Sequence, residues 1–330
     1  MASATTPVRA TRAPLATQAA PPDVSVLVPA KDEAENLPEF LAQCAAAFAE
    51  HPEARYEVVV IDDGSRDGSW ALLAQLAEQY PFLLPVRHRA QRGIAEALRT
   101  GWLASRGPIL VFYPADLQFK PADIPRLVRP ILAGEADMVT GQKQGVYEKA
   151  FVSGIYNRLS RALFRVPVKD LNSVKAYRRE VMSLVPTRPD WHRYLIVIAA
   201  TEGYTVTEIP VALYPRTAGK SKFGLSRIPI GVLDMLAVWF ELRFGRKPLL
   251  LFGMLGAAMF AVGVLSGVVA LLVLAFTGVG LRAVWTVIQT SLVLGSIFFA
   301  TGILGEQIAG ARADLRELRR RVDDVAPGGE

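Results

Sequence analysis

The first half of the chain alternates short apolar runs with segments of helical periodicity. The apolar runs cover residues 24–28, 57–61 and 109–113, and helices are predicted over residues 33–49, 67–79, 93–105 and 121–133. Strands that are apolar throughout are typical of a parallel sheet covered on both faces. The pattern therefore predicts an α/β domain with a mostly parallel sheet.

Beyond residue 138 the alternation becomes less regular. Extended segments are predicted at residues 138–140, 174–177 and 204–214, and helices over residues 151–164 and 191–202. The domain is placed at residues 23–224. Residues 1–22 are rich in Ala, Thr and Pro and lack the apolar core of a signal peptide, so they predict a disordered tail.

The last third of the chain contains two long uncharged runs. Residues 248–281 and 283–305 carry no charged side chain, and each run exceeds the roughly 20 apolar residues that a bilayer crossing needs. They predict a transmembrane hairpin over residues 248–309, with spans at about 249–276 and 283–305; the alternative is a buried helical pair of a soluble protein. An amphipathic segment over residues 225–247 is expected to lie along the membrane surface.

Charge decides the predicted orientation of this hairpin. Basic residues flank both spans, and by the positive-inside rule both ends lie in the cytoplasm, with residues 310–330 as a charged tail at the inner (plasma) membrane. The formal charge of +6 points to anionic lipid, because the sequence has none of the patterns of a nucleic-acid-binding protein. The single cysteine, Cys44, excludes an internal disulfide and fits a reducing compartment.

The residues directly after the run 109–113 carry the first candidate chemistry. Asp116 and Gln118 place a carboxylate and an amide oxygen two residues apart where a strand ends, which is where an open α/β sheet binds its ligand. Such oxygens suit a hard divalent cation, and that cation commonly holds the phosphates of a nucleotide. The alternative is that Asp116 only caps the turn before the helix that Pro121 opens.

A second polar cluster follows the run 57–61. Asp62 and Asp63 end this strand, and Asp67 opens the next helix. Ribose hydroxyls or the edge of a base are natural partners for these carboxylates. An Asx turn combined with a helix cap is the alternative for part of the cluster.

A basic segment lies near the end of the predicted domain. Residues 218–221 resemble the end of a P-loop, but the first glycine of that motif is missing and Pro215 removes a backbone donor. Arg216, Lys220 and Lys222 instead predict phosphate binding, with anchoring to lipid headgroups as the alternative.

Taken in order, several motifs point to a known family. They are residues 28–36 (VPAKDEAEN), 60–65 (VIDDGS), Arg92-Gly93, 115–118 (ADLQ), Asp170 and Ser173 before 176–178 (AYR), and Arg216 with 219–223 (GKSKF). Together they resemble family 2 glycosyltransferases of the GT-A fold. The narrower resemblance is to polyprenyl-phosphate glycosyltransferases, the group that contains dolichol-phosphate mannose synthase and bacterial undecaprenyl-phosphate sugar transferases. It covers about residues 24–224.

The resemblance implies roles for individual residues. It implies that the base and ribose are surrounded by Pro29, Lys31, Glu33, Asp62 and Asp63. It implies that Mg²⁺ or Mn²⁺ is bound by Asp116 and Gln118, and phosphate by Arg216, Ser221 and Lys222. Asp116, Arg216 and Lys222 are then the expected catalytic residues, and the same motifs add Arg92, Gly93, Ala115, Lys143, Asp170 and Ser173 to the expected binding site.

Two positions depart from the family pattern. An aspartate is usual two residues before Asp116, where this chain has Pro114, and the usual Thr-Tyr-Asn before the early glutamate is Ala30-Lys31-Asp32. The first departure bears on metal affinity and the second on the identity of the nucleotide.

The activity implied by the resemblance is inverting transfer of a sugar from a nucleotide-diphosphate sugar to a polyprenyl phosphate. A catalytically inactive membrane scaffold and a polysaccharide synthase are the alternatives, although the sequence lacks the Gln-x-x-Arg-Trp motif of such synthases. Small residues in both spans also predict a homo-oligomer, or else serve contacts within the hairpin: Gly253, Gly256, Ala257, Gly295, Ser296 and Gly302.

Overall fold

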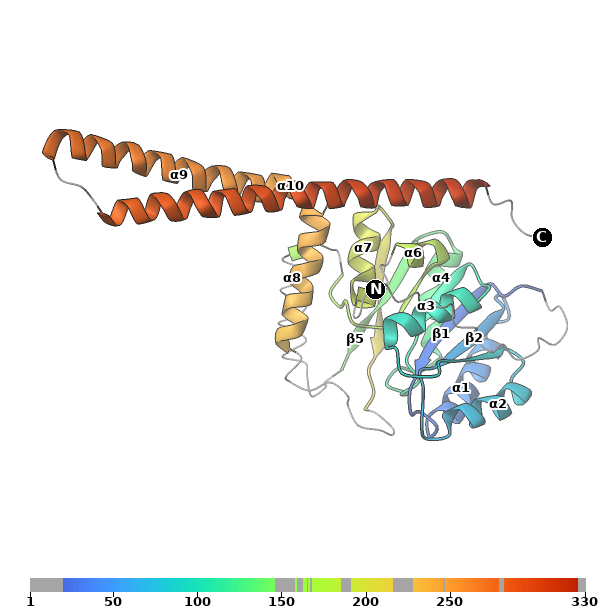
Figure 1. Cartoon of the computed structure of the whole chain (residues 1–330). Coiled ribbons are helices and arrows are strands. Elements are labelled where there is room, and N and C mark those ends of the chain that lie inside the picture. The colour runs from blue at the N-terminus through green and yellow to red at the C-terminus, as the bar shows by residue number, and fades with distance from the viewer. Residues whose placement is uncertain are drawn as a thin grey trace. The chain divides into compact units, whose positions relative to one another are not determined.

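The computed structural model describes two compact units. It covers residues 20–145, 158, 163–164, 166, 168–184, 191–215, 228–245, 247–278 and 282–325. The first unit ends at Met235 and the second begins at Leu236. The first unit contains the α/β domain, and the second contains the two long apolar helices (Figure 1).

A seven-stranded sheet forms the centre of the first unit, in the order β3-β2-β1-β4-β6-β5-β7. Strand β6 runs antiparallel to β4 and β5, and the other neighbouring strands are parallel. The prediction of a mostly parallel sheet is therefore confirmed. The strands are β1 (Val24–Ala30), β2 (Tyr56–Asp62), β3 (Leu83–Arg87), β4 (Ile109–Phe112), β5 (Met138–Gln144), β6 (Lys175–Arg178) and β7 (Val206–Ala212).

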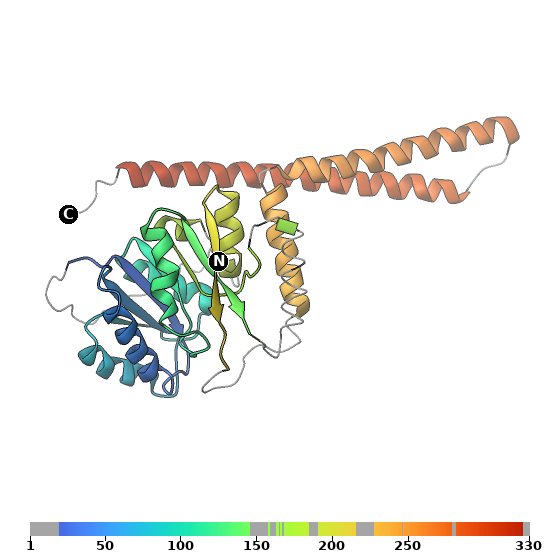
Figure 2. The same cartoon turned by 180° about the vertical axis from the view of Figure 1, so that it is seen from behind.

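Helices cover both faces of this sheet (Figures 1 and 2). Helices α1 (Leu37–Ala49), α2 (Ser69–Gln79) and α4 (Asp123–Leu132) share a core with alternate strand residues such as Val26 and Val60. On the opposite face, α3 (Ile94–Ala104) comes so close that a Cβ at Gly101 would lie 2.8 Å from Ile61 Cδ1. On this face α3 contacts the 3₁₀ helix η1 (Trp191–Tyr194), which packs against α7 (Leu195–Thr201), and α7 in turn contacts α6 (Arg179–Ser183).

Several predicted elements differ from the observed ones. Helix α1 begins at Leu37 rather than residue 33, because the preceding residues form a turn in which Asp32 has φ +53°. The sequence did not predict β3, since Pro85 argues against a strand; β3 lies at the edge of the sheet, where proline is tolerated. The helix predicted over residues 151–164 falls largely outside the described residues.

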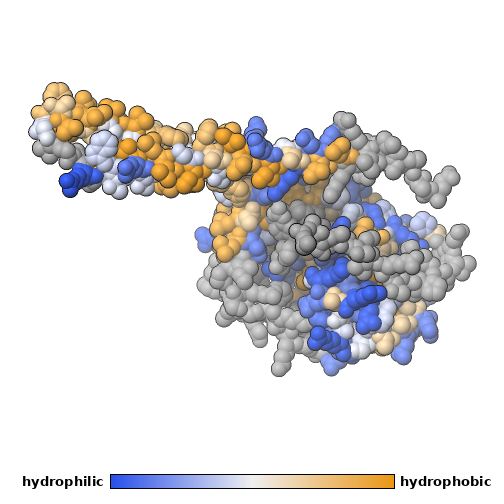
Figure 3. Space-filling model, in the orientation of Figure 1, coloured by the Kyte–Doolittle hydropathy of each residue, from blue (hydrophilic) through white to orange (hydrophobic). Residues whose placement is uncertain are grey.

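The second unit is dominated by two long helices, α9 (Pro248–Thr277) and α10 (Arg282–Val325). Both contain a segment long and apolar enough to cross a membrane, Pro248–Thr277 and Val284–Leu315. Figure 3 shows apolar side chains along the surface of these segments. Helix α10 continues without a break into the residues predicted as a separate tail, to Val325.

Small residues of the hairpin lie where the backbones of α9 and α10 approach each other closely. A Cβ at Gly256 would lie 2.9 Å from the carbonyl oxygen of Gly295, and one at Gly302 would lie 3.2 Å from the amide nitrogen of Gly253. Close backbone approach at small residues is how helices pack in a membrane. These four glycines therefore serve contacts within the hairpin, which was the alternative to a role in self-association.

Candidate active site

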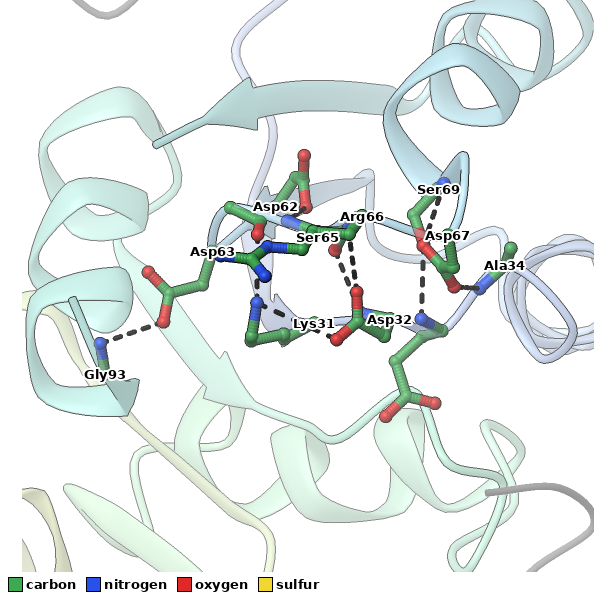
Figure 4. A network of polar contacts seen from close by, with 12 residues as sticks. Lys31, Asp32, Ala34, Asp62, Asp63, Ser65, Arg66, Asp67, Ser69 and Gly93 are labelled. Carbon is green, nitrogen blue, oxygen red and sulfur yellow. Dashed lines mark hydrogen bonds and ion pairs between the residues drawn. The ribbon is translucent and has the colours of Figure 1, made fainter. Parts of the chain in front are cut away.

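The loops after β1 and β2 are joined by a network of side-chain to backbone hydrogen bonds (Figure 4). The Lys31 ammonium donates to the carbonyl oxygen of Gly64 at 2.9 Å, and Asp32 accepts from the amide of Arg66 at 2.8 Å. Asp67 accepts from the amide of Ala34 at 3.0 Å. These charged residues therefore shape the loops at the carboxyl end of the sheet.

Glu33 and Asp67 illustrate how the early motif is built. The Glu33 carboxylate accepts from the side-chain amide of Asn36 at 2.7 Å, directly before α1. Asp67 accepts from both the amide and the hydroxyl of Ser69, at 3.1 and 2.5 Å, and burial, which alone would raise its pKa, is outweighed by these bonds so that the pKa falls. The Asx turn expected as an alternative is thus present at Asp67. Pro29, in the same motif, is half-buried in β1.

Asp62 is fully buried at the end of β2. Its Oδ1 accepts from the amide of Ser65 at 2.9 Å, while its Oδ2 lies 3.3 Å from Arg87 Nε in an ion pair. Within the described residues, Oδ2 accepts no hydrogen bond. The guanidinium of Arg87 also lies over the ring of Trp70, 5.4 Å from its centroid. The second oxygen of Asp62 is therefore buried, and its ion pair with Arg87 balances its charge.

Asp63 has a different environment from its neighbour. It accepts from Nδ1 of His88 and from the amides of Arg92 and Gly93, each at 2.8 Å. Burial alone would raise the pKa of Asp63, but these hydrogen bonds outweigh it and lower the pKa below its ordinary value. The carboxylate of Asp63 thus contacts the loop before α3, and its predicted contact with the base or ribose stays a prediction. The expected site residues Arg92 and Gly93 are held in this way.

A pocket of about 430 Å³ opens at the ends of β1, β2 and β3, and we call it the β1–β3 pocket. Four cationic side chains line it, compared with one carboxylate, so it favours an anionic or acceptor-rich ligand. The lining residues are Lys31, Asp32, Gly64, Ser65, Arg66, Arg87, Arg89, Ala90 and Gln91.

The segment after β4 carries the expected metal ligands. Asp116 and Gln118 are half-buried, whereas Ala115 and Leu117 are buried, and Leu117 has φ +57°. The backbone amide of Gln118 donates to Asp116 Oδ1 at 3.3 Å. The backbone carbonyl of Gln118 accepts from the backbone amide of Tyr214 at 2.9 Å. Within the part of the chain that the structure describes, no three His, Cys, Asp or Glu side chains could hold a metal ion together. Ligand oxygens would have to complete any coordination shell here.

Lys143, Asp170 and Ser173 are brought together near the same end of the sheet. Lys143 Nζ lies 3.4 Å from Asp170 Oδ2, and a Cβ on Gly141 of β5 would lie 3.0 Å from Ser173 Oγ. Ser173 Oγ is buried and has no hydrogen-bond partner among the described residues. Glu208 on β7 fixes the loop by accepting from the amides of Lys169 and Asp170, at 2.6 and 3.0 Å.

Lys175 and His192 are two buried groups near this loop that the sequence did not single out. Lys175 is opposite Phe112 in the β4–β6 pairing and donates to the carbonyl oxygen of Leu171 at 3.2 Å. Burial lowers the pKa of Lys175 to about 7 and that of His192 to about 3. The signal that could have found Lys175 is its place in the motif that begins at Asp170. Arg216, Ser221 and Lys222 lie outside the described residues.

Solved structures with the same fold match the first unit. Glucosyl-3-phosphoglycerate synthase from Mycobacterium tuberculosis, in complex with Mn²⁺, UDP and phosphoglyceric acid, matches 67% of this chain and 78% of its own, with a TM-score of 0.53 and 19% identity. The same enzyme with Mg²⁺ and UDP gives a TM-score of 0.52, with 19% identity over 67% and 79% of the two chains. The first unit thus has the GT-A fold, as predicted.

Sequence comparisons match a family domain within the first unit and relatives along most of the chain. Residues 25–181 match the family Glycosyl transferase family 2, so the chain contains a domain of that family. The dodecaprenyl-phosphate galacturonate synthase of Rhizobium johnstonii is 27% identical over 92% of this chain and 91% of its own. The undecaprenyl-phosphate 4-deoxy-4-formamido-L-arabinose transferase of Pseudomonas fluorescens is 29% identical over 90% and 88%. The predicted resemblance to polyprenyl-phosphate glycosyltransferases and the predicted enzyme class, a glycosyltransferase, are confirmed.

Proposed function

We propose that this glycosyltransferase moves a sugar from a nucleotide-diphosphate sugar to a polyprenyl phosphate, such as undecaprenyl or dolichyl phosphate, at the cytoplasmic face of the membrane. The extent of the sequence match carries this proposal. Relatives whose names contain a polyprenyl phosphate match about nine-tenths of the chain, whereas the glucosyl-3-phosphoglycerate synthase structures match two-thirds.

The order of strands supports a place for the nucleotide. The β1–β3 pocket adjoins the ends of β1, β2 and β3, and Asp116 follows β4, which is the next strand beside β1. Neighbouring strands are about 4.8 Å apart. A nucleotide with its base at the pocket would therefore extend its diphosphate toward Asp116, while Arg87, which lines the pocket, is paired with the buried carboxylate of Asp62.

The residues after β4 fit a divalent cation that also binds the donor. Asp116 and Gln118 would hold Mg²⁺ or Mn²⁺, which would neutralise the negative charge that develops on the departing diphosphate. Mg²⁺ keeps few protein ligands, so two side-chain oxygens suffice when diphosphate oxygens complete the shell. GT-A neighbours that contain Mn²⁺ or Mg²⁺ with UDP support this choice.

The transfer requires no strong general base. A polyprenyl phosphate is anionic, so its oxygen attacks the anomeric carbon from the face opposite to the diphosphate. The bond between the anomeric carbon and the diphosphate breaks, and its electron pair leaves with the nucleoside diphosphate. The configuration inverts. Basic residues favour this step by stabilising the phosphates, and we assign that role to Lys143, Arg216 and Lys222, with the Ser221 hydroxyl as a neutral hydrogen-bond donor.

The membrane hairpin would concentrate the acceptor. Helices α9 and α10 are long enough to cross a bilayer, and their basic flanks favour a cytoplasmic location for both termini at the plasma membrane. Confinement to the surface where the lipid phosphate resides raises its effective concentration. Self-association through the hairpin stays a prediction, which mass measurement of the detergent-solubilised protein tests.

A screen of nucleotide sugars with polyprenyl phosphate tests the proposal. We expect release of nucleoside diphosphate with one donor, dependent on both the lipid phosphate and a divalent cation. Release that proceeds equally without the lipid would contradict the assigned acceptor. No release with any donor would favour the inactive scaffold, and growth of a polymer would favour the polysaccharide synthase.

A further inference from the structure

A buried network joins the end of β2 to the start of α3. The side chains of Asp63 and His88 are 7% and 4% exposed, and Asp63 Oδ1 lies 2.8 Å from His88 Nδ1. Asp63 also accepts from the amides of Arg92 and Gly93, at the point where α3 begins. One carboxylate thus ties the histidine and two consecutive backbone amides to the end of β2.

The hydrogen bonds determine how His88 is oriented. The carboxylate of Asp63 can only accept, so Nδ1 carries the hydrogen. The other ring nitrogen, Nε2, lies 2.8 Å from Thr100 Oγ1 on α3. This order of carboxylate, imidazole and hydroxyl resembles that of a nucleophilic triad. However, Thr100 is not among the residues that line the β1–β3 pocket.

Gly64 fixes the same loop from a second direction. Its φ is +72°, and a Cβ there would lie 2.8 Å from both Ala90 C and Gln91 N. The backbone after Asp63 therefore lies directly against residues 90–91. Both of these residues line the β1–β3 pocket. The loop over residues 88–93 is therefore hydrogen-bonded to Asp63 at both ends, and its middle lies against the backbone of Gly64.

We propose that His88 is a positioning residue for donor binding, which acts by orienting Asp63 and, through it, the loop over residues 88–93, of which residues 89–91 line the β1–β3 pocket. This inference rests on the proposed function, because it takes the ligand of the pocket to be the nucleotide of the donor. His88 touches neither the donor nor the reacting atoms in this assignment. Its loss should affect donor affinity rather than turnover at saturation.

Three histidine variants of the full-length protein separate this role from a general loss of stability. His88→Leu removes the hydrogen bond to Asp63, while His88→Asn can keep a donor near the position of Nδ1. His51→Leu is the matched control, because His51 also contacts a carboxylate, that of Glu53 at 2.9 Å, but is exposed. Gly64→Ala displaces the loop without changing His88 and serves if His88→Leu does not fold.

Two measurements decide the outcome. The first is hydrogen exchange of the amides of Arg92 and Gly93; the second is the affinity for UDP, GDP, ADP and CDP with Mn²⁺, together with the donor KM and kcat. We expect His88→Leu and Gly64→Ala to lose amide protection and to weaken binding and raise the donor KM about tenfold. The kcat should stay within about twofold. His88→Asn should restore most of the affinity, and His51→Leu should match wild type.

Unchanged protection and affinity in His88→Leu would overturn the inference, as would a fall in kcat with unchanged donor affinity. A wild type that binds none of the four nucleotides would contradict the proposed function at this pocket. Amide exchange would then still decide whether His88 orders the loop. The two failures are therefore distinguishable.

Discussion

The carboxylate of Asp170 lies 3.4 Å from the ammonium of Lys143, and both side chains are largely buried, at 6% and 14% exposure. The residue after Asp170 supplies the carbonyl that accepts from Lys175, so two lysines adjoin one short loop. One of them, Lys143, is assigned to the phosphates of the substrates. The other, Lys175, is fully buried and gives the loop a measurable dependence on pH.

The first prediction concerns stability against pH. Burial lowers the pKa of Lys175 from its ordinary 10.5 to about 7. Between these values the unfolded chain binds a proton that the folded chain lacks, so stability rises as the pH rises above 7 and is insensitive to this group below 7. Relative to Lys175→Met, wild type should gain about 1–2 kcal/mol between pH 7 and 9 in detergent. If the free energies of unfolding of the two proteins changed by the same amount between pH 7 and 9, the assigned pKa would be contradicted.

The second prediction concerns the metal. Asp116→Asn is nearly isosteric but removes the charged ligand, so transfer should fall by about a hundredfold or more while folding is retained. Turnover is measured at saturating donor, with thermal unfolding as the control for folding. A variant with turnover close to wild type would remove Asp116 from the proposed metal site.

The third prediction concerns Pro114, where the family pattern has an aspartate. Pro114 is half-buried two residues before Asp116. We expect Pro114→Asp to lower the metal concentration needed for half-maximal activity and to change saturated turnover little, because the added charge acts mainly on metal occupancy. Metal titrations of both proteins, after unfolding measurements show that the variant folds, decide this. An unchanged midpoint would mean that residue 114 does not face the cation.

The fourth prediction concerns the hairpin. Gly256→Ala places a Cβ 2.9 Å from the carbonyl oxygen of Gly295, where backbone must move, so we expect a loss of about 1–3 kcal/mol in stability. Gly310→Ala is the matched control, since a Cβ on Gly310 meets no atom within 4 Å and alanine favours a helix. Equal thermal stability of the two variants would argue against close packing at Gly256.

Much of the fold could be predicted from the sequence because its signals are local. Apolar strands such as residues 57–61 and 109–113 indicate a parallel sheet by themselves. By contrast, the pairing of Asp63 with His88 depends on the register of β2 and β3, in which Asp62 is opposite Arg87. Because Pro85 argues against a strand, the sequence did not predict β3, and without β3 the contact between Asp63 and His88 could not be predicted.

The expected site was predicted in the same uneven way. A carboxylate at the end of a strand predicts a position at the carboxyl edge of the sheet, and Asp62, Asp63 and Asp116 are all found there. The partners of each carboxylate are not a local property. Asp63 accepts hydrogen bonds from backbone amides 29 and 30 residues away, while Asp62 Oδ2 accepts none among the described residues and is ion-paired with Arg87. Spacing along the chain does not distinguish these two neighbours.

The central claim is that the sugar itself moves to a lipid monophosphate. The most direct test is mass analysis of the lipid and nucleotide products that wild type forms from polyprenyl phosphate and its donor. We predict a polyprenyl-phosphate sugar that contains one phosphorus, with one nucleoside diphosphate released for each sugar transferred. A lipid product with two phosphorus atoms and release of nucleoside monophosphate, or a sugar product without lipid, would contradict the account.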